Sequence, residues 1–234
     1  MQFDFLRSSR FGFFTLCVIL AAWVTPAPAD VIYNGGAPDQ GGQIYSEAPS
    51  SAAMSFELTP GETDITGVEW WGGCYPATTC GAGTFQVSIW SDNSGVPGTV
   101  LDFAPVGDGN QTATANLIGG TGGWDEYAYS AGFGAFTNLS ADTTYFLVIQ
   151  ETESEPSGTW GWETTSSAPG GAFLEGNDGT GWTSLPETLA FELTGPPATS
   201  AVPEPASLPL LCAGFVVLIG AWRRSRALPM SRAR

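Results

Sequence analysis

The sequence lacks histidine and lysine altogether, and its seven arginines all lie in residues 1–29 or 203–234. Residues 30–202 therefore carry no basic side chain, but they hold 21 of the 23 acidic residues, the other two being Asp4 and Glu204. Without histidine this segment can form no Ser-His-Asp or Cys-His catalytic arrangement and no imidazole metal site. Without lysine it cannot form a phosphate-binding P-loop. Its charge repels phosphate backbones, so nucleic acid is excluded as a partner.

The N-terminus has the pattern of an export signal. Arg7 and Arg10 precede an apolar run at residues 11–24, and Ala27 and Ala29 form a small-x-small cleavage site before Asp30. This order of charge, apolar run and small residues is typical of a signal peptide. We predict a signal peptide over residues 1–29, which signal peptidase removes.

The C-terminus combines a short motif, an apolar run and a basic cluster. The motif is Val202, Pro203, Glu204 and Pro205, and the basic cluster is Arg223, Arg224 and Arg226. The apolar run from Leu208 to Trp222 is shorter than the roughly 20 residues of a comfortable membrane span, although the preceding Ala206 and Ser207 lengthen it. We predict a transmembrane helix over residues 206–222, which the arginines stop on the cytoplasmic side.

This order of Pro-Glu-Pro, apolar helix and arginines resembles the PEP-CTERM sorting tail of exported bacterial proteins. The resemblance covers about the last 30 residues and implies processing by an exosortase. It also implies transient anchoring in the inner membrane and delivery to the cell surface or to an extracellular biofilm matrix of exopolysaccharide. A plain C-terminal membrane anchor is the alternative.

The four cysteines divide between the termini and the exported part. Cys17 lies in the signal peptide and Cys212 in the tail, which leaves Cys74 and Cys80 in residues 30–202. Two nearby cysteines in an exported chain predict a disulfide, since the compartment is oxidising.

The segment between the ends contains no long run with helical periodicity and instead shows short alternating runs. In residues 84–92, for example, Phe85, Val87 and Ile89 alternate with polar or aromatic residues, which is the period of a half-buried strand. We predict strands at residues 51–59, 64–72, 84–92, 98–106, 112–118, 143–151, 158–164 and 188–195. Turn formers lie between them, as at residues 91–98 and 119–123.

These strands predict an all-β fold, a single antiparallel β-sandwich of jelly-roll type over residues 30–195. Residues 196–202 would form a linker, and residues 203–234 the sorting tail. The runs around "GVEWWGG" and "FQVSIWSDNSGVPGTVL" also resemble ectodomains that accompany this tail, which implies a sandwich without an assigned activity.

Tryptophans offer one candidate binding surface, because an indole face can stack on a sugar ring. Trp160 and Trp162 share one face of a predicted strand, while the adjacent Trp70 and Trp71 must point to opposite faces. We take these four as candidate glycan-stacking residues. The alternative is that each fills the core of the sandwich.

Acidic loops and carboxylate pairs give two weaker candidates. The loops at residues 92–94, 108–110, 125–126 and 175–178 could bind Ca²⁺, but none has the EF-hand order and turn chemistry explains each of them. We expect no cofactor and assign no metal ligand. A glycoside hydrolase would need two carboxyl groups, and Glu69 and Glu163 lie beside tryptophans. We expect a non-catalytic structural or adhesive protein, with a glycan-active enzyme or a Ca²⁺-dependent adhesin as alternatives.

Overall fold

A computed structural model describes residues 29–197, apart from residues 78, 154–157, 168–170 and 177–180. Three predicted segments lie largely or wholly outside the described residues. These are the signal peptide at residues 1–29, of which only Ala29 is described, the linker at 196–202, of which only 196–197 are described, and the tail at 203–234. No helix in the described part of the chain is long and apolar enough to cross a membrane.

The described residues form fourteen strands. They are β1 (Asp30–Asn34), β2 (Gln43–Tyr45), β3 (Ser51–Glu57), β4 (Ile65–Tyr75), β5 (Phe85–Asp92), β6 (Pro97–Gly107), β7 (Thr112–Ile118), β8 (Trp124–Phe136), β9 (Thr144–Glu151), β10 (Thr159–Thr165), β11 (Ala172–Glu175), β12 (Trp182–Ser184), β13 (Thr188–Leu189) and β14 (Phe191–Gly195).

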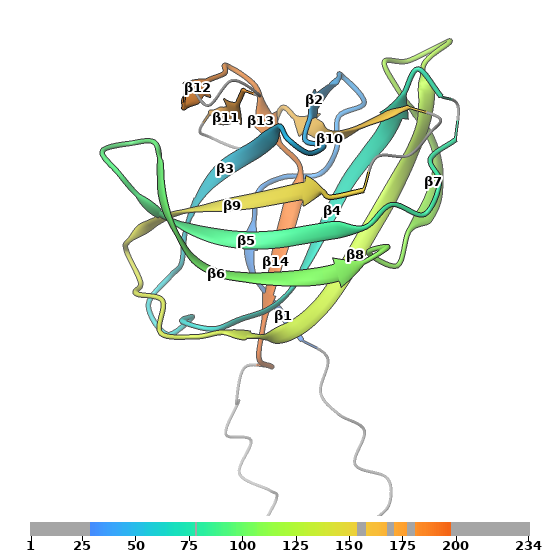
Figure 1. Cartoon of the computed structure of the whole chain (residues 1–234). Coiled ribbons are helices and arrows are strands. Elements are labelled where there is room, and N and C mark those ends of the chain that lie inside the picture. The colour runs from blue at the N-terminus through green and yellow to red at the C-terminus, as the bar shows by residue number, and fades with distance from the viewer. Residues whose placement is uncertain (1–28, 78, 154–157, 168–170, 177–180, 198–234) are drawn as a thin grey trace, which may run out of the picture. The chain divides into compact units, whose positions relative to one another are not determined.

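The strands form two antiparallel sheets that face each other (Figure 1). In sheet A, β8 lies along one side of the long strand β4, while β14 and β10 follow one another along the other side. Strands β1, β2, β7 and β13 extend this sheet. Sheet B has the order β12-β11-β3-β9-β5-β6. The predicted all-β sandwich is confirmed, and its jelly-roll connectivity stays a prediction.

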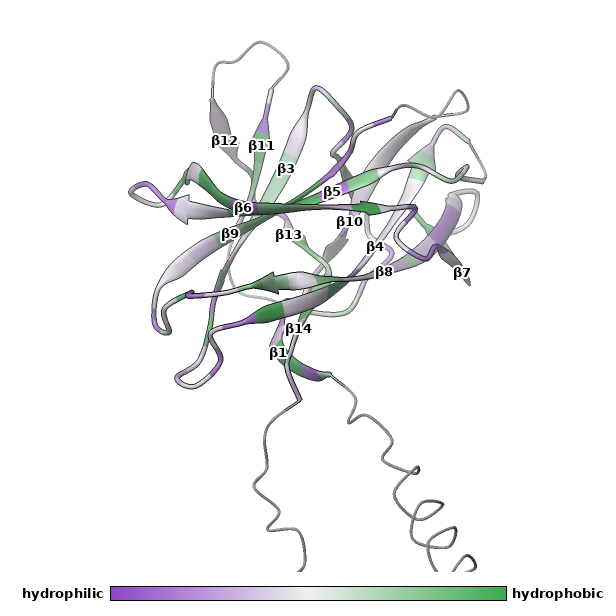
Figure 2. Cartoon of the chain, turned by 60° about the horizontal axis from the view of Figure 1, so that its bottom comes forward, coloured by the Kyte–Doolittle hydropathy of each residue, from purple (hydrophilic) through white to green (hydrophobic). Residues whose placement is uncertain are grey.

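The core lies between the sheets and consists of the inward side chains of both. Phe85 of sheet B makes edge contacts with Trp70 and Trp160 of sheet A, at ring-centroid distances of 5.5 and 4.9 Å. Val87, Ile89, Leu147 and other apolar side chains at alternate positions complete this core. Figure 2 shows the corresponding alternation of hydrophobic and hydrophilic residues along the strands.

The tight connections follow from their turn-forming residues. Between β5 and β6, the Asp92 carboxylate accepts a hydrogen bond from the backbone N–H of Gly95, at 2.8 Å. Gly95 has φ +87°, a conformation that glycine adopts without steric cost. Between β7 and β8, residues 119–123 form the second predicted turn.

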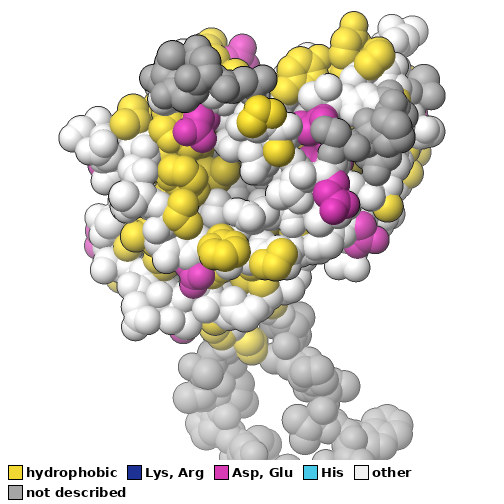
Figure 3. All heavy atoms as spheres, viewed as in Figure 1, with side chains coloured by type: hydrophobic (Ala, Val, Ile, Leu, Met, Phe, Trp, Pro, Cys, Tyr) yellow, Lys and Arg dark blue, Asp and Glu magenta, His cyan; other side chains and the backbone are white. Residues whose placement is uncertain are grey.

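Sheet B carries a small apolar cluster on its outer face, separate from the main core. Phe146, Val148 and Phe173 are buried there, with Trp90 and Trp182 packed partly exposed against them. Along the edge strand β6, Val100, Leu101 and Phe103 are exposed. Figure 3 shows apolar side chains gathered over the strands of this face, with carboxylates scattered among them.

Candidate functional site

Three of the four predicted glycan-stacking tryptophans lie in the core. Trp70, Trp160 and Trp162 are each 0% exposed. Trp70 stacks on Tyr129 with a centroid distance of 5.3 Å, and the Trp162 indole N–H donates to the carbonyl oxygen of Ala190. A ring that solvent does not reach cannot stack on a sugar, so the prediction is wrong for these three residues. Trp160 and Trp162 do share a face, but it is the inner one.

Trp71 is the member of this set that reaches solvent. It is half-buried, and it points away from the core because its neighbour Trp70 points inward. It lies opposite Ala128 in the pairing of β4 with β8. Alternation correctly predicted that at most one of the adjacent pair Trp70 and Trp71 belongs to the core.

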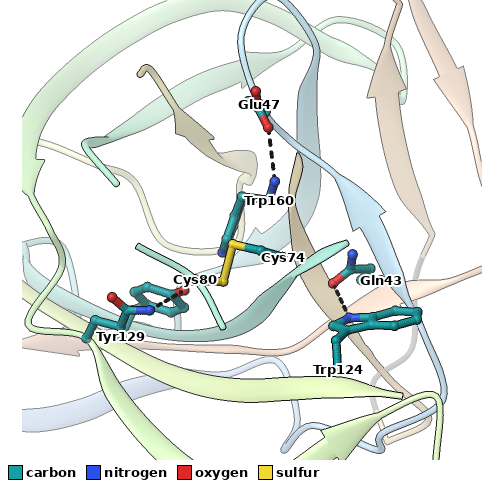
Figure 4. Close-up of a disulfide and its surroundings, with 8 residues drawn as sticks. Gln43, Glu47, Cys74, Cys80, Trp124, Tyr129 and Trp160 are labelled. Atoms are coloured by element: carbon teal, nitrogen blue, oxygen red, sulfur yellow. Dashed lines mark hydrogen bonds between the residues drawn. A yellow bond between two sulfur atoms is a disulfide. The ribbon is translucent and has the colours of Figure 1, made fainter. Parts of the chain in front are cut away.

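The predicted disulfide between Cys74 and Cys80 is present (Figure 4). Cys74 lies near the end of β4 with its side chain buried beside the core, and the bond closes a loop of residues 75–79. Tyr75 therefore directly follows Cys74, whose backbone is fixed by β4 and whose side chain is fixed by the disulfide. The disulfide restrains this exposed tyrosine against the outer face of sheet A.

Three aromatic side chains form a cluster on the outer face of sheet A, which we call the aromatic face: Tyr45 of β2, Tyr75 of β4 and Trp124 of β8. The side chains of Tyr45 and Tyr75 are 43% and 46% exposed, and their ring centroids lie 6.4 Å apart. The Tyr75 and Trp124 centroids are 5.1 Å apart, with the rings nearly perpendicular. Strands β2 and β4 both pair with β10, and β8 pairs with β4. Sheet A therefore brings together three aromatic residues that are far apart in the sequence.

Two glycines leave room for this arrangement. Gly73 of β4 and Gly161 of β10 are paired across the sheet. A Cβ at Gly73 would lie 2.8 Å from Cδ1 of Trp124, and one at Gly161 would lie 2.5 Å from Cδ of Gln43. Because both Cβ atoms are missing, the Trp124 ring and the Gln43 side chain lie close against the sheet, joined by a 3.0 Å hydrogen bond from Trp124 Nε1 to Gln43 Oε1 (Figure 4).

A cavity of about 480 Å³ opens beside the aromatic face. Gln43 and Tyr45 belong both to its lining and to the aromatic region. The rest of the lining consists of Gly41, Gly42, Ile44, Thr164, Leu174, Leu185 and Glu187. The Nε2 atom of Gln43 is buried and has no hydrogen-bond partner.

A pair of buried carboxyl groups lies nearby on sheet A. Glu126 of β8 and Glu163 of β10 are 1% and 0% exposed. Glu126 accepts a hydrogen bond from Nδ2 of Asn116, and Glu163 accepts one from the backbone N–H of Gln40. The second oxygen of each has no hydrogen-bond donor. Burial, and then the neighbouring Glu126, raise the pKa of Glu163 to about 9, so Glu163 is neutral at pH 7.

The acidic loops use their carboxylates within turns. Asp92 accepts from the N–H of Gly95, as described above, and Asp108 accepts from the N–H of Asn110 at 3.1 Å. No group of three or more acidic or cysteine residues in the described ranges is arranged to hold a metal ion. Calcium binding at these loops stays an untested alternative, and part of the loop at residues 175–178 lies outside the described residues.

The two carboxyl groups named for a hydrolase differ in their surroundings. Glu163 is buried, accepts a hydrogen bond from the backbone N–H of Gln40 and is affected by the charge of Glu126. Glu69 is half-buried and pairs in register with Glu192 of β14. Burial, and then the charge of Glu192, raise the pKa of Glu69. The enzyme alternative stays a prediction.

Comparison with known protein families identifies the C-terminal tail. Residues 201–226 match the PEP-CTERM protein-sorting motif. The chain carries a PEP-CTERM sorting motif. The match includes the Pro203-Glu204-Pro205 triplet, the apolar run and the cluster Arg223, Arg224 and Arg226. The motif implies an exported surface protein that an exosortase processes, with membrane anchoring before release.

The other comparisons add little about the ectodomain. No curated protein matches the chain. Among solved structures, a similar one is that of the cysteine protease and lectin-like domains of Cwp84, a surface layer associated protein of Clostridium difficile. The identity is 11% and the TM-score 0.40, over 62% of this chain and 31% of that chain. A likeness at this level carries no argument about function.

Proposed function

We propose that this chain is an adhesive component of a bacterial cell surface or exopolysaccharide matrix, whose β-sandwich binds glycan through the aromatic face of Tyr45, Tyr75 and Trp124. Signal peptidase and exosortase would be its processing partners, and the tail would anchor it transiently in the inner membrane. The role is non-catalytic. The sorting motif supports the destination, and the aromatic face supports the binding.

The observation that carries the binding proposal is the pair of adjacent, exposed tyrosine rings. Tyr45 and Tyr75 each expose over two-fifths of their surface, although burying an aromatic side chain would stabilise the fold. Both sit on strands rather than on loops, and Cys74, which the disulfide holds, immediately precedes Tyr75. Rigid, exposed rings over a sheet offer apolar faces to the C–H groups of a pyranose.

The test is retention of the full chain, purified in detergent, on the exopolysaccharide of the producing bacterium. We expect the wild type to bind and the Tyr45→Ala/Tyr75→Ala double variant to lose binding. Phe103→Ala is the matched control, because Phe103 is an aromatic residue of sheet B that is 57% exposed. If the wild type does not bind, the glycan function is wrong. If the double variant binds as well as the wild type, the site is wrong.

A further inference from the structure

We propose that the aromatic face and the cavity beside it bind a glycan with free amino groups, in preference to a neutral or an acidic glycan. This inference rests on the proposed glycan-binding function and names the chemical class of its ligand.

The charge of the surface favours a cationic ligand. The described residues contain no lysine, arginine or histidine. A glycan built of uronic acids would therefore find no cation to balance its carboxylates. Acidic side chains instead accompany the site: Glu187 lines the cavity, and Glu47, which accepts a hydrogen bond from the backbone N–H of Trp160, lies two residues after Tyr45. Carboxylates of the protein repel those of a uronic acid, whereas they attract an ammonium group.

The site combines aromatic faces with carboxylates. An ammonium group is attracted to the face of an aromatic ring within about 6 Å of the ring centroid. Tyr45 and Tyr75 present two such rings with their centroids 6.4 Å apart. Glu187 is exposed and Tyr45 lines the same cavity, so one amino sugar can contact a ring and a carboxylate together.

The size and polarity of the cavity fit a sugar. Its volume of about 480 Å³ lies within the ~300–1,000 Å³ that is typical of small-molecule sites. Its lining includes apolar side chains, such as Leu174 and Leu185, and the polar residues Gln43, Thr164 and Glu187. This mixture suits a sugar, which presents C–H groups on its faces and hydroxyl groups on its edges.

The experiment compares three tetrasaccharides of the same length by calorimetric titration of the full chain in detergent. They are tetramers of glucosamine, N-acetylglucosamine and galacturonic acid, which carry positive, zero and negative charge near pH 6. We expect the glucosamine tetramer to bind at least ~10-fold more tightly than the acetylated one at low salt, with no measurable binding of the galacturonate. A higher salt concentration should reduce this difference in affinity between the free and the acetylated tetramer, because salt screens charges near the surface.

Variants separate this site from a general attraction between a cationic sugar and an acidic protein. Tyr45→Ala should weaken binding of both the free and the acetylated tetramer. Glu187→Gln should reduce the preference for the free amine several-fold while leaving affinity for the acetylated tetramer unchanged. Glu57→Gln removes the same charge at an exposed position on β3 of sheet B and should change neither affinity.

The outcomes distinguish this inference from the function on which it rests. Equal affinity for the free and acetylated tetramers, or tighter binding of the galacturonate, overturns the amino-sugar inference and leaves glycan binding in place. An affinity for the glucosamine tetramer that Tyr45→Ala leaves unchanged, or a preference that falls equally with Glu57→Gln and Glu187→Gln, also overturns it, since the total charge alone would then explain the attraction. If none of the three binds, the glycan-binding function itself fails.

Discussion

Glu126 of β8 raises the pKa of Glu163 of β10 by its charge, although β4 lies between their strands and both carboxyl groups are buried. Asp39, in the connection that precedes β2, also acts on Glu163 by its charge, while the N–H of Gln40 donates to it. Neighbouring carboxylates repel each other, so burial of both groups favours the state in which Glu163 retains its proton.

The first prediction concerns the pH dependence of folding. The pKa of Glu163 rises from 4.5 to about 9 on folding, so between these values the folded chain holds a proton that the unfolded chain has released. Glu163 therefore stabilises the fold fully below about pH 4.5, and this stability is lost as the pH rises toward 9. The free energy of unfolding should fall by up to ~1.4 kcal/mol per pH unit in this window.

Glu163→Gln tests this prediction, because glutamine has the shape of the neutral acid and does not ionise. Denaturant unfolding from pH 5 to pH 9 should show a smaller decline in stability for Glu163→Gln than for the wild type. Glu57→Gln, at an exposed position, serves as the control. Parallel declines in the wild type and Glu163→Gln would contradict the assignment.

The second prediction concerns the disulfide. Cys74 and Cys80 are six residues apart. Closing so short a loop lowers the conformational entropy of the unfolded chain, which stabilises the fold by about 2 kcal/mol. Cys74→Ser/Cys80→Ser should lose about this much free energy of unfolding, and so should the wild type under a reducing agent. A reduced wild type with unchanged stability would argue against a structural role.

The third prediction distinguishes core tryptophans from the partly exposed one. Trp160→Ala should cost about 3–5 kcal/mol, because it leaves a cavity between the two sheets. Trp71→Ala should cost much less, since solvent already reaches that ring. Chemical denaturation measures both, and similar losses in the two variants would mean that the two positions are equally buried.

The fourth prediction concerns the glycine beneath Trp124. A Cβ at Gly73 would lie 2.7 Å from the backbone oxygen of Asp125 and 2.8 Å from Trp124. Gly73→Ala should therefore lower stability by about 1–3 kcal/mol and change the fluorescence of Trp124. Gly134→Ala is the matched control, because a Cβ there meets no atom within 4 Å. Equal effects of the two substitutions would contradict the close packing.

The fifth prediction concerns the sorting motif at residues 201–226. Replacing Pro203, Glu204 and Pro205 by alanine should leave the exported chain in the membrane fraction, because the apolar run stays while the processing sequence is lost. Immunoblotting of membrane, surface and medium fractions measures the outcome. Normal release of this variant would show that the triplet is dispensable for processing.

The sequence predicted most long strands because their side chains alternate. The run predicted at residues 112–118 coincides with β7, and those at 84–92 and 143–151 differ from β5 and β9 by one residue at one end. Strand β8 was missed, although it is thirteen residues long. It is rich in alanine and glycine, which have low strand propensity, and its pairing with β4 and β7 stabilises it instead.

The candidate site was harder to predict, because alternation shows which residues share a face and not which face lies inside. Trp160 and Trp162 were grouped correctly, but only the packing against Phe85 shows that their face is the core. Tyr45, Tyr75 and Trp124 come from three separate strands, and no local pattern links them. The predicted disulfide at Cys74 was the one sequence signal near this site, because a disulfide restrains the neighbouring residue, here Tyr75.

The absence of basic side chains also affects how many copies of the protein behave together. The carboxylates of this domain have no internal cations to neutralise them, so mobile counterions from the medium must accompany each copy. In a dense extracellular layer these ions hold water osmotically, and neighbouring copies repel each other within a Debye length. A layer rich in this protein would therefore swell in fresh water and contract in brine.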